Sequence, residues 1–541
     1  MPSSPGETNQ PHAVPRDRWR WAVTGGLLAL AFLFGSFPMA DFDPWWHLRT
    51  GQFILQHRAV PQVDIYTYTN AGAPWIDVYW LFQVAIALLY RVGGVSALVG
   101  LKVVVGVAIV GCTLAARRPG AASWPAVLVW LPGLLVLSGR LNERPELFSL
   151  LFLAGFLLVL GRAQDQPRGL WLLPLLQLLW VNSHGFFVLG PLIVVAYGAD
   201  RLVCRVRGIA LPPRLARNLA LAGGAVCVAC FINPYGVGVF RLPLQQFHKL
   251  GAGIYRTHIG ELKSISDFIS LAGMKNPYLL ALLFMFALGI ASFAWALAQR
   301  RYSLFRGLLF VGSAYLGWQA TRNSALFALV AAMVTLWNLD DGVEQKRPVV
   351  PAARRGRRAP RPRLRRRLEP VLLLAIALHA TAVLSGGLYA WAGEGRSVGF
   401  GERKQWYAHE SCAFLARPGM PERMVAFNLG QAGVCIAHTG EQRKQFLDPR
   451  LEVSSPETFE RYLAGLRGLW RGGPDWEAAL AIDRSRPDQI PALLIERGVL
   501  SRVIEVLMHD PRWLCVHADG VAAVFVDAGF VEAHGLPAVR P

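Results

Sequence analysis

Residues Ala40–Arg58 read ADFDPWWHLRTGQFILQHR and directly follow the first long apolar run of the chain. Asp41 and Asp43 therefore stand where that run would leave a membrane, within reach of both lipid headgroups and water. Pro44 then begins an amphipathic segment. The aromatic and ionisable side chains of this segment are Trp45, Trp46, His47 and Arg49. We expect the other helices to build a cavity around this stretch.

The composition is that of an integral membrane protein. Of the 541 residues, 53% are hydrophobic and 17% are charged, whereas about a quarter of the residues in a soluble domain are charged. We interpret Trp19–Met39 as an uncleaved transmembrane helix, because no small-residue cleavage site follows it. Arg16, Arg18 and Arg20 would hold the start of this helix in the cytoplasm.

The net charge of +20 does not indicate nucleic-acid binding. Much of the excess lies in one Pro/Ala/Arg-rich stretch between two apolar helices, and no nucleic-acid-binding motif accompanies it. We interpret residues 341–369 as a basic cytoplasmic loop that fixes the topology and contacts anionic membrane lipid. Its 11 positive charges are Lys346, Arg347, Arg354, Arg355, Arg357, Arg358, Arg361, Arg363, Arg365, Arg366 and Arg367.

Apolar runs of about 16–22 residues predict about eleven membrane spans. They lie at 19–39, 95–116, 121–138, 145–161, 169–181, 185–203, 217–232, 277–298, 303–320, 323–339 and 370–391. The segment Asp77–Arg91 is apolar but short, and counting it as a span would place every later basic loop outside the cell. We therefore expect it to lie in the outer interface as a helix over the cavity. This topology puts the N-terminus inside.

The expected fold is an all-α polytopic membrane protein that carries an α/β extracytoplasmic domain at its C-terminus. The transmembrane domain would comprise residues 1–391, with interfacial helices in an outer loop at 41–94. The extracytoplasmic domain would comprise residues 392–541, a length that can form its own core.

Local patterns in the C-terminal segment predict mixed secondary structure. Met424–Asn428 and Val521–Asp527 are typical of strands, and Ser455–Leu469 is typical of a helix that starts at a Ser-Pro cap. Two cysteines of this segment could form a disulfide, and the sequence leaves the pairing open. The candidates are Cys412, Cys435 and Cys515.

Polar residues gather at the predicted outer ends of five helix junctions. They are Asp41, Asp43 and His47, then Arg140, Asn142, Glu143 and Arg144, then Asn182, Ser183 and His184, then Asn233 and Tyr235, and finally Arg322 and Asn323. Arginines at an outer surface oppose the positive-inside rule, so they need another reason to be there. An anion at the level of the membrane supplies one, because ionisable groups at such depth are usually functional.

Each of these residues also has a structural interpretation. Asp43 precedes a proline and could cap the following helix, which would lower its pKa. His47 could be an ordinary interfacial residue, although its spacing from Asp43 places both on one helical face. Arg140 and Arg144 could pair with Glu143 or Glu146 or extend to the headgroups. A further set could serve only as helix–helix hydrogen bonds or as a turn: Asn182, His184 and Asn233–Gly236.

The stretches around these residues resemble a known family. They are DFDPWWHLRTGQFILQHRAVPQVDIYTYTNAGAPW, RLNERPELFSLLF, LWVNSHGFF, FINPYG and TRNSALFALV. Together they look like the GT-C class of membrane glycosyltransferases, and the resemblance covers residues 1–391 well and the tail weakly. In that family an aspartate of the first outer loop is the catalytic base. Asp43 matches this position best and Asp41 is the reserve, whereas APWIDVYW departs from the KPPL-type stretch of the family.

The resemblance implies that a sugar moves from a polyprenyl-phosphate donor to a glycan, lipid or protein acceptor, with inversion. The reaction would take place on the outer face of a bacterial cytoplasmic membrane. Arg322 would stabilise the departing phosphate, with Arg144 or Arg140 assisting. The candidates for holding the sugar and the acceptor are Trp45, Trp46, His47, Asn182, His184, Tyr235 and Asn323.

We expect chemistry without a metal, and if a divalent ion takes part, Asp41, Asp43 and His47 are its candidate ligands. Two other classes of function stay open. A transporter or flippase of lipid-linked saccharides would need alternating access. A non-catalytic scaffold would act through residues 392–541. Either of these would bind lipid-linked sugar without releasing polyprenyl phosphate.

Overall fold

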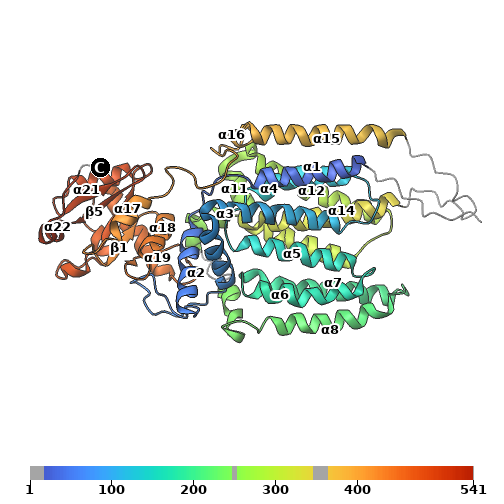
Figure 1. The fold of residues 1–541 in the computed structure, drawn as a ribbon, viewed down its shortest axis with the longest axis horizontal. Coiled ribbons are helices and arrows are strands. Elements are labelled where there is room, and N and C mark those ends of the chain that lie inside the picture. The colour runs from blue at the N-terminus through green and yellow to red at the C-terminus, as the bar shows by residue number, and fades with distance from the viewer. Residues whose placement is uncertain (1–17, 246–252, 345–362, 540–541) are drawn as a thin grey trace, which may run out of the picture.

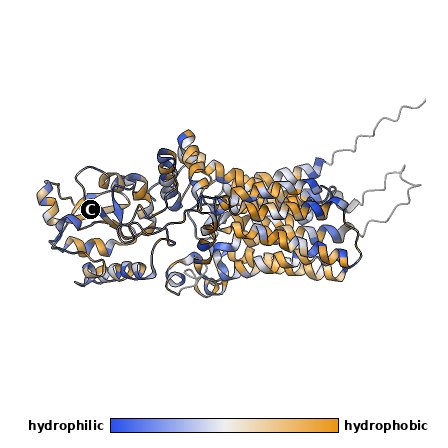
Figure 2. Cartoon of the chain, turned by 90° about the horizontal axis from the view of Figure 1, so that it is seen from below, coloured by the Kyte–Doolittle hydropathy of each residue, from blue (hydrophilic) through white to orange (hydrophobic). Residues whose placement is uncertain are grey.

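The computed structural model describes residues 18–245, 253–344 and 363–539. Helices that run side by side form an elongated bundle, and the C-terminal segment packs against one end of it (Figure 1). Apolar residues dominate the bundle, whereas the C-terminal segment is mixed (Figure 2). Arg16 and most of the predicted basic loop at 341–369 lie outside the described residues.

Helices lie over each of the predicted apolar ranges. They are α1 (Arg18–Gly35), α3 (Trp80–Ala115), α4 (Trp124–Ser138), α5 (Glu146–Arg162), α6 (Leu172–Val181), α7 (Leu189–Val206), α8 (Pro213–Ala229), α12 (Pro277–Ala298), α13 (Leu304–Gln319), α14 (Ser324–Glu344) and α15 (Arg363–Leu384). Four described helical stretches are long and apolar enough to cross a membrane: Trp80–Ala115, Gly185–Val206, Pro277–Ala298 and Thr321–Asp341. The figure of about eleven spans stays a prediction.

Two consecutive glycines bend α3 after its first turns. Gly93 has φ −148° and ψ 21°, and Gly94 has φ 57° and ψ −148°, so neither is helical. The positive φ of Gly94 is one that residues with a Cβ rarely adopt. This break lies between the segment Asp77–Arg91 and the predicted span that begins at 95, and the interfacial position of the segment stays a prediction.

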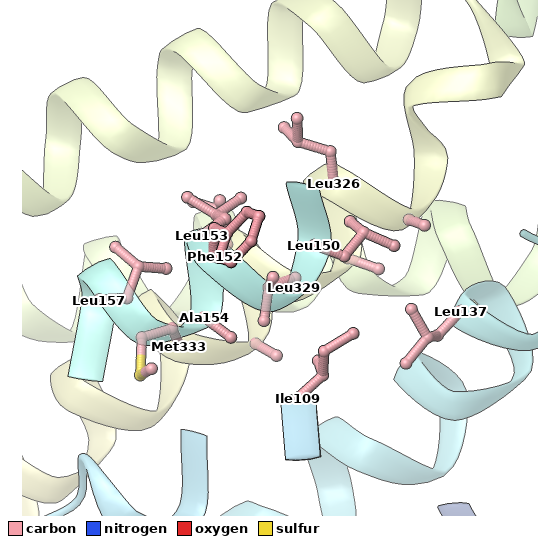
Figure 3. Packing of buried hydrophobic residues seen from close by; sticks show 14 of the residues in the cluster. Ile109, Leu137, Leu150, Phe152, Leu153, Ala154, Leu157, Leu326, Leu329 and Met333 are labelled. Atoms are coloured by element: carbon pink, nitrogen blue, oxygen red, sulfur yellow. The ribbon is translucent and has the colours of Figure 1, made fainter. Parts of the chain in front are cut away.

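The centre of the bundle is a close-packed apolar core around α14. Figure 3 shows residues of α14 against α5, with α3 and α4 adjoining. The labelled members are Ile109, Leu137, Leu150, Phe152, Leu153, Ala154, Leu157, Leu326, Leu329 and Met333. This packing fixes the helix ends from which the polar connections of the bundle project.

The helix α2 (Asp43–His57) crosses the end of the bundle that faces the C-terminal segment (Figure 1). It packs closely on the first part of α3. A Cβ atom built on Gly51 would lie 2.0 Å from the backbone oxygen of Gln83, so only glycine allows this approach. The contact sets the position of the acidic start of α2.

The C-terminal segment contains a five-stranded sheet with the order β2-β1-β3-β5-β4. Strand β1 is parallel to β2 and β3, whereas β5 is antiparallel to β3 and β4. The strands are β1 (Arg423–Ala426), β2 (Lys444–Gln445), β3 (Ala492–Glu496), β4 (Trp513–Ala518) and β5 (Ala522–Asp527). Helices pack around this sheet, so the segment has an α/β architecture. They include α17 (His409–Leu415), α18 (Leu429–Thr439), α19 (Pro456–Arg471), α21 (Ser501–Met508) and α22 (Ala528–His534).

Local predictions for this segment are confirmed. Strands β1 and β5 lie where strands were expected, and α19 begins after Ser455, whose side chain accepts the N–H of Thr458. The open disulfide pairing is also resolved, because Cys412 of α17 is bonded to Cys435 of α18. Cys515 is a free, buried thiol.

The connection between α2 and α3 joins the bundle to this sheet. Thr67 bridges Gln445 at the edge strand β2, and the backbone N–H of Tyr68 donates to the Gln445 oxygen. Arg450 is fully buried nearby in an ion pair with Asp64. The C-terminal segment is therefore held against the bundle by backbone pairing and by buried charge.

Candidate active site

A pocket of about 120 Å³ lies where α2, the polar connections of the bundle and the C-terminal segment meet. The predicted residues that line it are Asp43, Trp46, His47, Arg140, Arg144, His184 and Arg322. Further lining side chains include Tyr79, Glu146, Glu261 and Glu452. The structure thus brings most of the predicted site together, from helix junctions far apart in the sequence.

Arg144 contacts the carboxylates of both Asp41 and Asp43, at the start of α2. Its Nε donates to Asp41 Oδ2 at 2.5 Å and lies 3.2 Å from Asp43 Oδ2. The other oxygen of Asp41, Oδ1, accepts the backbone N–H of Asp43 at 3.0 Å. Asp41 therefore has both oxygens engaged and orients the start of α2, whereas Asp43 faces the pocket.

The alternative in which Asp43 caps α2 is wrong. Asp43 is the first residue of the helix, and a carboxylate oxygen of Asp41 accepts its backbone N–H. Burial raises the pKa of Asp43 to about 7, with Arg144 opposing the rise and Asp41 adding to it. About a quarter of the side chain, 26%, remains accessible. A carboxyl group with this pKa can accept a proton near neutral pH.

Two arginines of the connection between α4 and α5 are held by acidic partners. Arg140 donates to Glu146 at 2.8 Å and to Glu261 at 2.9 Å, and Arg144 donates to Glu261 at 3.0 Å. Glu261 belongs to the short helix η4 (Gly260–Leu262). Burial would raise its pKa, but Arg144 and Arg140 hold the pKa well below its usual range. Both arginines are therefore neutralised in place.

Arg322 differs from these two arginines. It lies in η6 (Thr321–Asn323), between α13 and α14, and lines the pocket. Within residues 18–245, 253–344 and 363–539 its side chain forms no hydrogen bond or ion pair, and Glu261, whose pKa it helps to lower, is already paired with Arg140 and Arg144. Its guanidinium is therefore available to bind an anion in the pocket.

Two histidines line the pocket in the neutral form. Burial and then Arg144 hold the pKa of His47 well below its usual range, and Gln83 Nε2 lies 3.2 Å from its Nδ1. Burial and then Arg322 lower the pKa of His184 to about 3. Neither imidazole adds charge at neutral pH, so each can act only through hydrogen bonds.

Three residues predicted to bind substrate do not line the pocket. Asn182 accepts from Trp80 Nε1 at 2.8 Å and donates to the backbone, so the helix–helix alternative describes it. The hydroxyl of Tyr235 donates to the Pro61 oxygen at 3.1 Å, next to the turn that Asn233 forms. The amide of Asn323 donates to a backbone oxygen of α13. Their side chains connect structural elements.

Two further expectations are corrected. Trp45 packs edge-on against Tyr407 and His409 of the C-terminal segment, away from the pocket. Glu143 does not serve the pocket arginines, because it forms an ion pair with Lys102 at 2.8 Å in which both side chains are buried. Trp45 and Trp46 point to different neighbours because adjacent helical residues lie about 100° apart.

Glu261 and Glu452 are site residues that sequence reasoning missed. Glu261 lies in the long connection between α8 and α12, and Glu452 lies in a turn between β2 and α19. No local pattern marks either residue. The excess of arginine at one end of the bundle was the available signal, because buried cations require acidic partners.

The proposed metal ligands do not form a metal site in this arrangement. The described residues contain no group of three or more His, Cys, Asp or Glu side chains placed to hold an ion. Arg144 occupies the space between Asp41 and Asp43 where such an ion would bind. We therefore derive no step of the chemistry through a metal.

No protein-family model matches the sequence, and a search of curated proteins finds no match. Solved structures do match. Archaeal oligosaccharyltransferase AglB from Archaeoglobus fulgidus, in complex with an inhibitory peptide and a dolichol-phosphate, aligns with a TM-score of 0.60 and 11% identity, over 96% of this chain and 75% of AglB. An Archaeoglobus fulgidus oligosaccharyltransferase in the apo form aligns with a TM-score of 0.57 and 11% identity, over 95% of this chain and 75% of that one.

Arabinofuranosyltransferase AftD from Mycobacteria aligns with a TM-score of 0.51 and 14% identity, over 95% of this chain and 40% of AftD. The chain has the GT-C fold. With this fold and with described helices that are long and apolar enough to cross a membrane, the chain is a membrane protein. The similarity to AglB and AftD spans the bundle and the C-terminal segment together.

Proposed function

We propose that this GT-C protein transfers a sugar from a polyprenyl-phosphate donor to an acceptor on the outer face of the bacterial cytoplasmic membrane, with inversion. One observation carries the proposal: the pocket combines Asp43, whose pKa is about 7, with Arg322, which has no partner among the described residues. The first is suited to remove a proton and the second to bind a phosphate. A similar fold was solved with a dolichol-phosphate bound, in AglB.

Asp43 would act as the general base. An acceptor hydroxyl bound in the pocket would give its proton to Asp43 as its oxygen attacks the sugar C1 atom. A base works best when its pKa lies near the operating pH, and burial supplies that shift here. Asp41 would act indirectly, because it orients the backbone of Asp43 and shares Arg144 with it.

Arg322 would bind the phosphate of the donor. Negative charge develops on this group as the bond from C1 to the phosphate oxygen breaks, and a guanidinium can donate two parallel hydrogen bonds to it. Arg140 and Arg144 would contribute less than expected from the sequence, because both are paired with carboxylates. Trp46 would line the pocket as an apolar wall for the sugar.

The proposed orientation places the pocket outside. The N-terminus would be cytoplasmic, residues 1–391 would form the transmembrane domain and residues 392–541 an extracytoplasmic domain. The disulfide between Cys412 and Cys435 supports this orientation, since disulfides persist in oxidising compartments. The basic ends of α7 and α8 would then face the cytoplasm.

The test is turnover by the purified protein and by Asp43→Asn. Lipid-linked sugars extracted from the source membranes would be supplied, and released polyprenyl phosphate would be measured by mass spectrometry. We expect release by the wild type and by the control Asp488→Asn, which changes an exposed carboxylate, and none by Asp43→Asn. Binding of the lipid without release by any variant would instead favour a flippase or a scaffold.

A further inference from the structure

A series of hydrogen bonds connects the side chains of Trp180, Ser149 and His184. The indole Nε1 of Trp180 in α6 donates to Ser149 Oγ of α5 at 2.8 Å. The same Oγ lies 2.9 Å from His184 Nδ1. Ser149 and Trp180 are fully buried between the two helices, so this series is fixed by the core of the bundle.

This series of hydrogen bonds determines which ring nitrogen of His184 carries the proton. The backbone N–H of Phe186 also points at Nδ1, at 3.3 Å, and a backbone N–H can only donate. Nδ1 must therefore accept. Ser149 Oγ accepts from Trp180, so its own proton is directed to Nδ1 as well. A neutral imidazole with an acceptor at Nδ1 carries its hydrogen on Nε2.

The Nε2–H group of His184 is free to donate a hydrogen bond to a molecule in the pocket. None of the described residues accepts a hydrogen bond from it, and His184 lines the pocket together with Arg322. The ring also stays neutral, because burial and Arg322 both disfavour protonation. His184 is thus a fixed hydrogen-bond donor that cannot become an acid or a base at neutral pH.

We propose that His184 Nε2–H donates a hydrogen bond to the phosphate of the departing polyprenyl phosphate, beside Arg322. This inference rests on the glycosyl transfer proposed above. In that step the bond from the sugar C1 atom to the phosphate oxygen breaks and its electron pair stays on the phosphate. The acceptor oxygen forms the new bond to C1, and its proton goes to Asp43. His184 transfers no proton, and Ser149 and Trp180 are positioning residues.

Two amide substitutions at one position separate this role from simple packing. The amide nitrogen of glutamine can reach the place of Nε2, whereas that of asparagine lies nearer the place of Nδ1. We expect His184→Asn to lower kcat by about 100-fold, the effect of losing one donor to a developing oxyanion. His184→Gln should keep at least about tenfold more of the activity. His57→Asn, at an exposed site outside the pocket, is the matched control.

A second measurement does not depend on turnover. Nitrogen-15 NMR of histidine-labelled protein, with the His184 signals assigned by their loss in His184→Gln, reports which ring nitrogen is protonated. We expect a hydrogen on Nε2 between pH 6 and 8, and the same tautomer in Ser149→Ala, because the backbone N–H of Phe186 still donates to Nδ1 in that variant. A hydrogen on Nδ1 in the wild type would overturn the inference while leaving the proposed transfer intact.

Equal kcat losses in the two amide variants would also overturn it, since packing alone would then explain both. Affinity for polyprenyl phosphate in mixed micelles gives the remaining check. His184→Asn should weaken it about tenfold more than His184→Gln does. If the wild type shows no turnover but His184 carries its hydrogen on Nε2, the result counts against the proposed glycosyl transfer. It does not count against the assigned tautomer.

Discussion

Arg450 donates to Asp64 at 2.6 Å across the contact between the C-terminal segment and the bundle, and neither side chain is exposed to solvent. The guanidinium of Arg450 also lies over the rings of Tyr66 and Trp75, at 4.9 and 4.4 Å from their centroids. The neighbouring residues Pro449, Leu451 and Glu452 form one wall of the pocket. The ion pair therefore holds part of the candidate site.

Replacing Arg450 by methionine should destabilise the protein by about 3–5 kcal/mol, because Asp64 would be left buried without its cation. Unfolding of the detergent-solubilised protein by denaturant would measure the change. Arg486→Met removes an arginine that is 65% exposed and should change the stability by less than about 0.5 kcal/mol. Equal effects of the two substitutions would show that the buried pair does not hold the segment.

Activity should follow the ionisation of Asp43. Because the carboxylate would be the active form of the proposed base and its pKa is about 7, kcat/KM should rise about tenfold per pH unit below that value and level off above it. Initial rates of polyprenyl phosphate release between pH 5 and 9 would show this. A profile without a break near 7 would move the base elsewhere.

The same ionisation should affect stability with the opposite sign. The folded state favours the protonated carboxyl, since burial raises the pKa of Asp43 above its ordinary value of 3.8. The stability that the protonated Asp43 carboxyl contributes is complete below pH 3.8 and is lost as the pH rises through 7. Asp43→Asn, which cannot ionise, should therefore gain stability relative to the wild type between pH 5 and 8 in thermal unfolding. A constant difference would contradict a raised pKa.

Arg322→Lys keeps the charge and removes the planar fork. It should cost about 1.5–3 kcal/mol of phosphate binding, the size of a charged hydrogen bond, and so about 10–150-fold in kcat/KM. Arg168→Lys, an exposed arginine in the connection between α5 and α6, serves as the control. An unchanged kcat/KM in Arg322→Lys would place the phosphate elsewhere in the pocket.

Gly51→Ala tests the close approach of α2 to α3. The added methyl would meet the Gln83 backbone oxygen at 2.0 Å, so α2 must shift, and we expect a loss of about 3 kcal/mol together with lower activity. Gly25→Ala in α1 adds a methyl where no atom lies within 4 Å. It should be neutral or stabilising by up to about 1 kcal/mol, because alanine favours the helix. Thermal unfolding of both variants measures the contrast.

The helices and the junctions that carry the site could be predicted from the sequence. Apolar runs report burial directly, and helices lie over each of the predicted runs. The gathering of Asp43, Arg144 and Arg322 around one pocket could also be predicted, because charge at the end of an apolar helix usually has a functional reason. These inferences need only short stretches of sequence.

Contacts between distant parts of the chain could not be predicted. Asn182 and Arg322 both follow an apolar helix, yet one bonds to Trp80 and the backbone and the other faces the pocket. A polar residue at a helix junction can satisfy a backbone group or bind a ligand, and only the packing of neighbouring elements decides between these roles. Glu261 and Glu452 show the same limit, since each reaches the site from a connection without local signal.

Asp64 and Arg450 are 386 residues apart in the sequence. The ribosome therefore synthesises Asp64 and the start of α2 long before it reaches Arg450. The bundle can enter the membrane while one wall of its pocket has not yet been translated. A chain that stops before Arg450 would insert its helices and remain inactive, so the order of synthesis delays activity until the C-terminal segment has been made.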